Sequence, residues 1–273
     1  MNSFHIKKFS GFIEEFDEKK LRESLILTGV GQKMASEVIQ ELMPKIKPGM
    51  SSTRVHNLAF SSLQKKSKIH AANYRIKRSI LDLGPSGYPF EILCSELFKA
   101  KGFATEVGVV VKGKHVSHEV DVIATRPDMT IMAECKFHNS KSHKNDIKTA
   151  LYIHARSLDI KNNPDSRDFD KFAICTNTHF SGDAVTYANG VGMMLLSLNK
   201  DPEYSMIGNI IRYKVYPITC LRTIKKKVAS ILLERKIVVI KQLEENIDML
   251  EELDYDEHDR FLVLKEIQKL RQQ

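Results

Sequence analysis

The sequence lacks any long apolar run. No stretch of its 273 residues approaches the roughly 20 apolar residues that span a bilayer. The opening residues 1–10 include His5, Lys7 and Lys8 and contain no apolar core of a signal peptide. We therefore expect a cytoplasmic protein with no membrane partner.

Cysteine is also scarce. The four cysteines, Cys94, Cys135, Cys175 and Cys220, lie far apart in sequence, and no CxxC pair occurs. Zinc ribbons and dithiol redox motifs need closely spaced cysteines, so the spacing argues against both kinds of site. We expect buried, apolar thiols.

Basic residues are missing from one segment of an otherwise basic chain. The formal net charge is +8, which favours an anionic partner. No Lys or Arg occurs between Glu244 and Asp259, so the basic surface belongs to the chain before this acidic segment. A solvated surface without a partner would carry the same charge, so the charge supports nucleic-acid binding and does not establish it.

The pattern of turns and apolar residues divides the chain into three predicted domains. With 42% hydrophobic and 28% charged residues, the composition is that of a folded protein, and the length favours two or three domains. Residues 1–82 combine a short strand with helices, residues 83–203 alternate helices and strands, and residues 204–273 are mainly helical. The turn-rich segment Gly84–Gly87 separates the first two. We predict a multidomain α/β protein.

The middle domain opens with a helix and three strands. Pro89 suits the first turn of a helix that begins after Gly87 and carries Glu91 near its start. Apolar alternation and turn residues then predict three neighbouring strands, at about Thr105–Val111, Val116–Ala124 and Thr130–Phe137.

Charged side chains share a face on the second and third of these strands. The two-residue period places Asp121 beside Glu119, and Glu134 beside Lys136. Carboxylates on adjacent strands can hold Mg²⁺ or Mn²⁺, and the ion lowers the pKa of a bound water that can attack a phosphodiester. The lysine can orient that water or neutralise charge developing on phosphorus. The alternative is a surface hairpin with a charged outer face.

Four segments carry a family resemblance over residues 84–197: "GYPFEILCSELFKAKGF", "HEVDVIA", "IMAECKF" and "FAICTNTHFSGDAVTYANGVGMMLL". Together they resemble the PD-(D/E)XK nuclease superfamily and, within it, the Mrr-type restriction endonucleases. The resemblance implies a restriction-endonuclease-like α/β core with a central mixed sheet that cleaves DNA. It also implies that Asp121 and Glu134 bind the metal, that Lys136 serves the attacking water, and that Glu91 completes or tunes the metal site.

Other positions around the motif are more open. Val120 stands where the family name has Pro, and its side chain points away from the metal face. Glu119 is an outer metal ligand, a DNA contact or a solvated side chain. Five basic side chains after the third strand suit phosphate contacts, with solvent exposure as the alternative: His143, Lys144, Lys148, His154 and Arg156.

The first domain carries a second resemblance, over residues 4–80. Its segments "IKKFSGFIEEFDEKKLRESL", "SSTRVHNLAFSSL" and "AANYRIKRSI" resemble the helical ATP-cone domain of ribonucleotide reductases and their repressor. The resemblance implies that ATP or dATP binds as a regulatory ligand. Phe9 stands where the family usually has Arg. The alternatives are a degenerate cone that only packs or dimerises, and a basic helical DNA-binding domain.

Seven residues are candidates for holding this nucleotide. Lys8 and Lys20 would meet the phosphates, and Glu14 or Asp17 would accept hydrogen bonds from base or sugar. By position in the resemblance, the further candidates are Ser52, His56 and Lys77.

The small helical C-terminal domain gives a weaker signal. Its segment "YPITCLRTIKKKVASILLERKIVVIKQL" predicts two short helices around a turn, in the manner of a helix-hairpin-helix, with Lys225–Lys227 placed for DNA phosphates. Arg235 and Lys236 stand where the usual turn glycine is expected. Packing against protein is the alternative.

Taken together, these features predict a metal-dependent DNA endonuclease that responds to ATP or dATP and acts in restriction, phage defence or repair. We expect a homo-oligomer, a dimer or tetramer, because two sites are needed to cut both strands together. The alternative is a non-catalytic nucleotide-sensing, DNA-binding or regulatory protein with a nuclease fold. A zinc-dependent repressor with an ATP cone is disfavoured because the sequence has no cysteine cluster.

Overall fold

The computed structural model describes residues 5–7, 13–26, 30–139, 143–198 and 204–272. The chain forms two compact units, residues 1–77 with 268–273 and residues 78–267. The predicted middle and C-terminal domains thus belong, apart from the last residues, to one unit, and the three-domain division stays a prediction. Within the described part of the chain, no helix has the length and apolar character needed to cross a membrane.

The first unit is helical with a small hairpin. Two short antiparallel strands, β1 (His5–Lys7) and β2 (Ile13–Glu15), precede the helices. The helices are α1 (Glu18–Ile26), α2 (Gln32–Leu42), the 3-10 turn η1 (Met43–Lys45), α3 (Ser52–Lys66) and α4 (Lys68–Leu81).

Local sequence explains where two of these helices begin. The Asp17 carboxylate accepts hydrogen bonds from the backbone N–H groups of Lys19 and Lys20 at the start of α1. The Ser51 hydroxyl accepts from Arg54 N and caps α3. Apolar positions at helical spacing then line the core of the unit, among them Leu21, Leu25, Ala35, Val38 and Leu42.

The second unit is built on a mixed five-stranded sheet with the order β3-β4-β5-β7-β9. The first three strands are antiparallel neighbours, whereas β7 and β9 run parallel to β5. The predicted central mixed sheet is confirmed. Its strands are β3 (Ala104–Lys112), β4 (Ser117–Arg126), β5 (Met129–Lys136), β7 (Lys171–Thr176) and β9 (Met194–Leu196).

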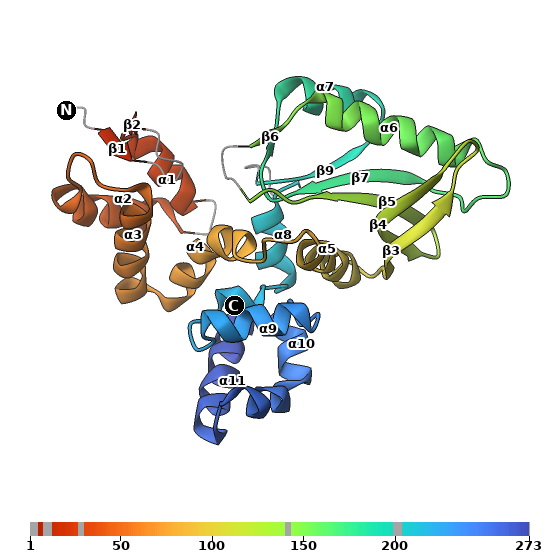
Figure 1. Ribbon diagram of the computed structural model, residues 1–273. Coiled ribbons are helices and arrows are strands. Elements are labelled where there is room, and N and C mark those ends of the chain that lie inside the picture. The colour runs from red at the N-terminus through yellow and green to blue at the C-terminus, as the bar shows by residue number, and fades with distance from the viewer. Residues whose placement is uncertain (1–4, 8–12, 27–29, 140–142, 199–203, 273) are drawn as a thin grey trace. The chain divides into compact units, whose positions relative to one another are not determined.

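Helices cover both faces of this sheet (Figure 1). The parallel strands need long crossovers, which α6 and α7 supply on one face, while α5 and α8 lie on the other. The middle of β5 is therefore buried on both sides, from Ile131 to Glu134. The bounds are α5 (Tyr88–Ala100), α6 (Ile147–Lys161), α7 (Gly182–Gly190) and α8 (Met206–Tyr213).

The segment before α5 packs against the end of β5. A side chain at Gly84 would lie 2.6 Å from Asn139 Oδ1 and 2.8 Å from the Phe137 ring, so only glycine fits there. Asn139 Nδ2 also donates to the Pro85 carbonyl at 3.2 Å. The turn-rich break predicted at Gly84–Gly87 is therefore anchored just beyond the strand that carries Glu134 and Lys136.

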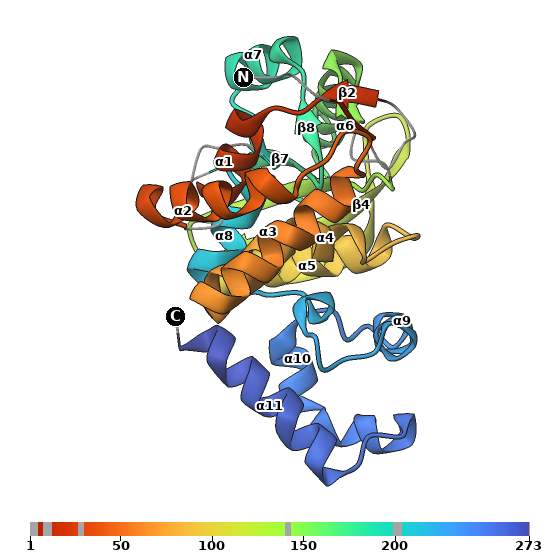
Figure 2. The same ribbon diagram turned by 90° about the vertical axis from the view of Figure 1, so that its left-hand side faces the viewer.

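The C-terminal helices form a group of their own (Figure 2). Lys236 lies between the first two, with a φ of 65° in the left-handed region that usually favours glycine. The elements are the 3-10 turn η2 (Ile218–Cys220), α9 (Lys226–Glu234), α10 (Ile240–Glu245), the 3-10 turn η3 (Ile247–Leu253) and α11 (Glu257–Arg271).

Candidate active site

The site lies where β4 and β5 separate. The ladder between them pairs Arg126 through Val122 with Met129 through Ala133 and then stops. Asp121 and Glu134 would form the next pair in this register. Instead of continuing the ladder, the Cys135 backbone N–H donates to Asp121 Oδ2 at 2.6 Å. At the point where the strands separate, the Asp121 carboxylate is thus held beside β5 by a backbone N–H of that strand.

Glu134 is a buried charge held by two cations. Its side chain is only 4% exposed, and Oε1 lies 2.5 Å from Lys136 Nζ. Oε2 accepts a hydrogen bond from Arg156 Nη1 at 2.7 Å. The other arm of Arg156, which comes from α6, donates to the Glu119 carbonyl oxygen. Arg156 thus joins α6, β4 and β5, and both oxygens of Glu134 are neutralised by close positive charges.

This arrangement corrects the expectation for Arg156, proposed from the sequence as a phosphate contact or an exposed side chain. The residue is 9% exposed and faces Glu134. The reason is spacing on α6, where Arg156 follows Ile153 by one turn and shares its buried face. His154, from the same set, bonds through Nδ1 to the Tyr187 hydroxyl. Lys148 is exposed, as its solvated alternative expects.

The carboxylates of the site destabilise one another's charge. Burial raises the pKa of Glu91 to about 7, and the charges of Asp121, Glu119 and Glu134 add to the effect. Burial also raises the pKa of Asp121 to about 6, with the charge of Glu134 as the next cause. The Cys135 N–H and the cation of Lys136 act in the opposite direction on Asp121. The structure therefore brings Glu91 into the same electrostatic environment as the two strand carboxylates.

The donor chemistry of these residues fits a divalent cation such as Mg²⁺. Carboxylate oxygens are its preferred protein ligands, and a cation would relieve the repulsion among the three side chains. The oxygens are not fully gathered, because the only three potential ligand atoms within 4.8 Å of one another in the described chain are sulfurs. The Lys136 side chain, which neutralises Glu134, is one-third exposed.

A polar network, missed in the sequence, fixes the chain beyond Lys136. The amide of Asn145 is buried and donates to the hydroxyls of Thr176 and Thr178 at 3.0 and 3.1 Å. Its carbonyl oxygen lies 3.0 Å from His138 Nε2. The side chain of Asn177 accepts from His138 N and donates to His138 O. The "TNT" run after β7 was the available signal, because polar residues in sequence after a buried strand mark a strand end.

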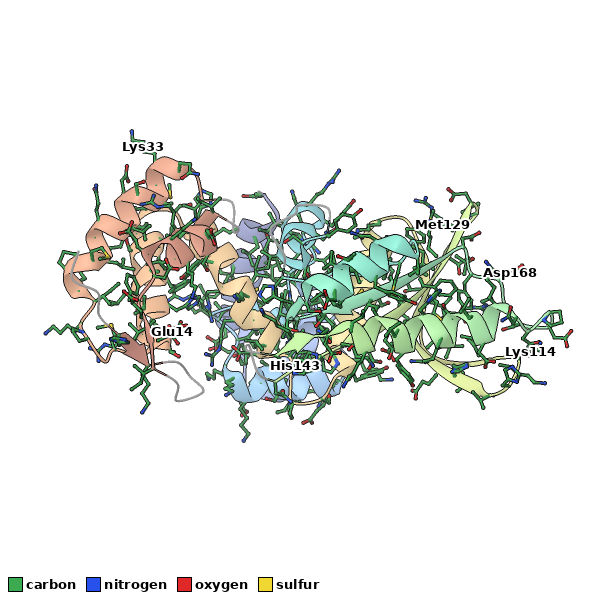
Figure 3. All side chains as sticks on the ribbon, turned by 90° about the horizontal axis from the view of Figure 1, so that it is seen from above. Glu14, Lys33, Lys114, Met129, His143 and Asp168 are labelled. Carbon is green, nitrogen blue, oxygen red and sulfur yellow. The ribbon has the colours of Figure 1, made fainter. Side chains whose placement is uncertain are left out.

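The two ends of the sheet differ in character. Figure 3 shows His143 at one end of this domain, with Lys114 and Asp168 at the other. His143 stacks on His138, with ring centroids 3.7 Å apart. His138 in turn follows β5 directly, so these rings lie at the carboxyl end of the strand that carries Glu134. Glu119 is exposed, in agreement with the solvated alternative.

The nucleotide-binding candidates lie in the first unit, except that Lys8 falls outside the described residues. Glu14 Oε2 and Lys20 Nζ are 3.9 Å apart, and Asp17 caps the helix that carries Lys20. Ser52 and His56 are one turn apart on α3.

Lys77 lies on the same helix as Tyr74, which contacts His56. His56 stacks on Tyr74 of α4 with ring centroids 4.4 Å apart. Lys77 is three residues beyond Tyr74 and so shares its side of the helix. The structure thus forms two groups, one around Glu14 and Lys20 and one around His56 and Tyr74. What these residues bind stays a prediction.

Comparison with known proteins gives two family matches, both after residue 83. Residues 84–200 match the model of a family described as restriction endonuclease, the Mrr catalytic domain. Residues 216–271 match one described as AF1548-like, C-terminal. The middle of the chain is therefore similar to a restriction-endonuclease domain.

Two further comparisons cover larger shares of the chain. An uncharacterized protein of Archaeoglobus fulgidus is 37% identical over 150 residues, which are 55% of this chain and 82% of the relative. A crystal structure of the protein of unknown function AF1548 shows 31% identity and a TM-score of 0.55, covering 68% of this chain and 98% of that one. The chain belongs to the AF1548-like family.

A third likeness is weaker. The MspJI restriction endonuclease, solved in complex with a 27-mer oligonucleotide, is 12% identical with a TM-score of 0.35. The match covers 76% of this chain and 44% of that one. At this score the two folds are not shown to agree, so the restriction-endonuclease-like assignment depends on the family match over residues 84–200.

The burial of Glu134 makes Arg156 a stability determinant. We expect Arg156→Met to lower the free energy of unfolding by up to about 3–5 kcal/mol, because it leaves a buried carboxylate with Lys136 alone. Urea unfolding of the full chain would measure the change. As a matched control, Arg167→Met removes the exposed ion pair with Glu106 and should cost about 0–1 kcal/mol. Equal effects of the two substitutions would contradict the role given to Arg156.

The raised pKa values predict a pH-dependent stability in a chelator such as EDTA. Glu91 and Asp121 have folded-state pKa values of about 7 and 6, above their ordinary 4.5 and 3.8. At a pH between the ordinary and the folded-state pKa of each group, the folded chain binds more protons than the unfolded chain. These two groups therefore make the free energy of unfolding fall as pH rises. Glu91→Gln should flatten the fall between pH of about 4.5 and 7, as measured by urea unfolding.

Two comparisons isolate the contribution of Glu91 to the pH dependence of the free energy of unfolding. Burial lowers the pKa of His138, which contributes a slope of opposite sign, so the informative quantity is the difference between parent and Glu91→Gln. Glu106→Gln, at a half-exposed position, should leave the slope unchanged. A parental slope in Glu91→Gln would show that the Glu91 pKa is not raised.

Proposed function

We propose that this protein is a metal-dependent DNA endonuclease whose active site is formed by Asp121, Glu134 and Lys136, with Glu91 tuning the metal site. The observation that carries the proposal is that the β4–β5 ladder stops just before Asp121 and Glu134, where the Asp121 carboxylate is held by the Cys135 N–H and Glu134 lies two residues before Lys136. The same residues lie within the restriction-endonuclease family match. Hard carboxylate oxygens and a lysine suit phosphodiester hydrolysis.

The chemistry divides among these side chains. A bound Mg²⁺ or Mn²⁺ would polarise a phosphoryl oxygen and lower the pKa of its water ligand. Asp121 and Glu134 would hold it, and Asp121 is oriented for this by the Cys135 N–H. Arg156 fixes the direction of the Glu134 side chain through its hydrogen bond to Oε2. With burial raising its pKa to about 7, Glu91 would be only partly deprotonated at neutral pH, and a cation that offsets the neighbouring charges would increase its ionisation.

In the proposed mechanism, Lys136 would interact first with Glu134 and then with the reacting groups. Without an ion, it neutralises Glu134 Oε1 at 2.5 Å. Were Glu134 to hold a cation, the ammonium group of Lys136 would be available to the attacking water or to the charge on phosphorus. The partial exposure of its side chain, 33%, allows this movement at low cost. In this scheme the ion pair seen here is a resting arrangement of the catalytic lysine.

We propose, further, that the first unit binds ATP or dATP and controls cleavage by changing the assembly of the protein. The support is the ATP-cone resemblance, together with the pair formed by Glu14 and Lys20 beside the strand that leads to Lys8. A nucleotide that favours one oligomer must bind that oligomer more tightly, typically by about 1–3 kcal/mol. Dimers or tetramers would place two cleavage sites on one DNA.

Cleavage of supercoiled plasmid in Mg²⁺ tests the catalytic assignment. Asp121→Asn, Glu134→Gln and Lys136→Ala should each reduce the rate by at least ~100-fold, because each removes a metal ligand or a charge-stabilising group. Lys136→Ala should keep DNA affinity nearly intact, because one lysine is a small part of a multi-phosphate footprint. Gel-shift assays and circular dichroism would separate binding, folding and chemistry.

The matched control is Lys114→Ala, an exposed lysine at the opposite end of the domain (Figure 3), which should cleave at the parental rate. A parental rate in Lys136→Ala would sink the catalytic role of that residue. A folded parent protein that binds DNA and never cleaves it, in Mg²⁺ or Mn²⁺, would instead support the non-catalytic DNA-binding alternative.

Nucleotide control predicts a change in mass. The double variant Lys8→Ala with Lys20→Ala should bind ATP or dATP at least ~10-fold more weakly, because two phosphate contacts are lost. Light scattering should show that nucleotide shifts the oligomer size of the parent and not of this variant. Lys33→Ala, an exposed lysine of the same unit, is the control. An unchanged mass beside a clear nucleotide effect on cleavage would exclude control through assembly.

A further inference from the structure

Three of the four cysteines meet in the core of the second unit. The sulfurs of Cys94, Cys135 and Cys175 all lie within 4.8 Å of one another. They come from α5, β5 and β7, and Cys135 and Cys175 are direct partners in the parallel ladder. The expected burial is confirmed for Cys94, Cys175 and Cys220. Cys135 and Cys175, which lie 40 positions apart in sequence, are brought together because β7 returns beside β5.

The cluster lies on the opposite face of β5 from Glu134. Alternation along a strand turns Glu134 toward Arg156 of α6 and turns Cys135 toward α5, where Cys94 is buried. Cys94 is also one helical turn beyond Glu91. The sulfurs thus lie beneath the candidate active site and share both its supporting strand and its supporting helix.

The separation of the sulfurs suits a shared ion. Metal–thiolate bonds are about 2.3 Å for zinc, so three sulfurs around one ion stand about 4 Å apart, which small side-chain movements would reach here. Cys94 and Cys175 are fully buried, and Cys135 is half-buried. Apolar packing alone explains burial of each thiol, but it does not require three sulfurs from three elements to converge.

We propose that Cys94, Cys135 and Cys175 form a three-sulfur site for a thiophilic ion of the zinc–copper(I) class. Soft thiolates select such ions over Mg²⁺, whereas the carboxylates across the strand select hard ions. The described residues offer no fourth His, Cys, Asp or Glu atom within the cluster. The site therefore takes an ion satisfied by three sulfurs, as copper(I) is, or zinc with water as its fourth ligand.

Such an ion would tie α5, β5 and β7 together directly under the candidate active site. Cys135 stands between Glu134 and Lys136, and its backbone N–H holds Asp121. Fixing its sulfur would therefore fix the backbone that positions Asp121. This structural role does not depend on whether the carboxylate face cleaves DNA.

Metal titration of the reduced full-length protein under anaerobic conditions tests the site. Cd²⁺ serves as the optical probe, because its thiolate bonds give ultraviolet charge-transfer absorbance. We expect this absorbance to rise to one equivalent and to be displaced by Zn²⁺ or by copper(I), and the stronger competitor identifies the preferred ion. Mg²⁺ in large excess should displace nothing. No absorbance with Cd²⁺, and no binding of Zn²⁺ or copper(I) by calorimetry, would overturn the proposal.

Matched variants assign the ligands. Cys94→Ala and Cys175→Ala should each weaken binding by more than the ~10–100-fold that is typical for residues supporting a metal site. Cys220→Ala replaces the fourth buried cysteine, which lies outside the cluster, and should bind as the parent does. Circular dichroism checks that each variant folds. Equal binding by Cys94→Ala and the parent would remove Cys94 from the site.

X-ray absorption of the zinc- or copper(I)-loaded parent gives a readout without substitutions. The proposal expects three sulfur neighbours, at ~2.3 Å for zinc. A shell of oxygen and nitrogen alone would overturn it, even if the ion binds tightly. Cleavage assays are not needed for this experiment, so its outcome is separate from that of the proposed nuclease function.

Discussion

The burial of one carboxylate shapes the second unit. Glu134 lies 4% exposed in the middle of the sheet, where an unpaired charge would cost several kcal/mol. Arg156 from α6 and Lys136 from the same strand offset that cost. The pairing fixes the angle at which α6 meets β5, and through the Glu119 carbonyl it also reaches β4. A catalytic assignment for Glu134 therefore involves the packing of α6 as well as the strand motif.

The two faces of β5 carry side chains with different ligand chemistry. Even-numbered Glu134 and Lys136 present oxygen and ammonium groups toward α6, and odd-numbered Cys135 presents sulfur toward α5. If both proposed sites bind ions, the first face would take hard ions and the second soft ions. Because consecutive residues of one strand supply both faces, a shift of β5 by one residue would exchange them and destroy both sites.

Local sequence patterns were sufficient to predict the helix and strands around the site and to place the charged residues on those strands. Period-two alternation placed β4 and β5 within two residues of their observed bounds, and Gly87 and Pro89 placed the start of α5. These signals are local, because each of them lies within a single short segment of the chain. Arg156, the sulfur cluster and Asn145 could not be found in this way, because their partners lie 22, 40 and 31 residues away in sequence. Only the parallel return of β7 beside β5 brings those partners together.

The anchoring of the segment before α5 bears on how a regulatory unit could act. Gly84 and Pro85 pack against Phe137 and Asn139, immediately after Lys136. His138, between them, is tied to Asn145 and Asn177. A pull on residues 82–84 would therefore reach the end of β5 through packed, hydrogen-bonded groups rather than through a loose linker. This gives a direct interdomain route a physical basis beside the assembly route. The two routes differ in the number of protomers that they need. Displacement of Phe137 would alter Lys136 within a single protomer, whereas control through assembly requires a second protomer.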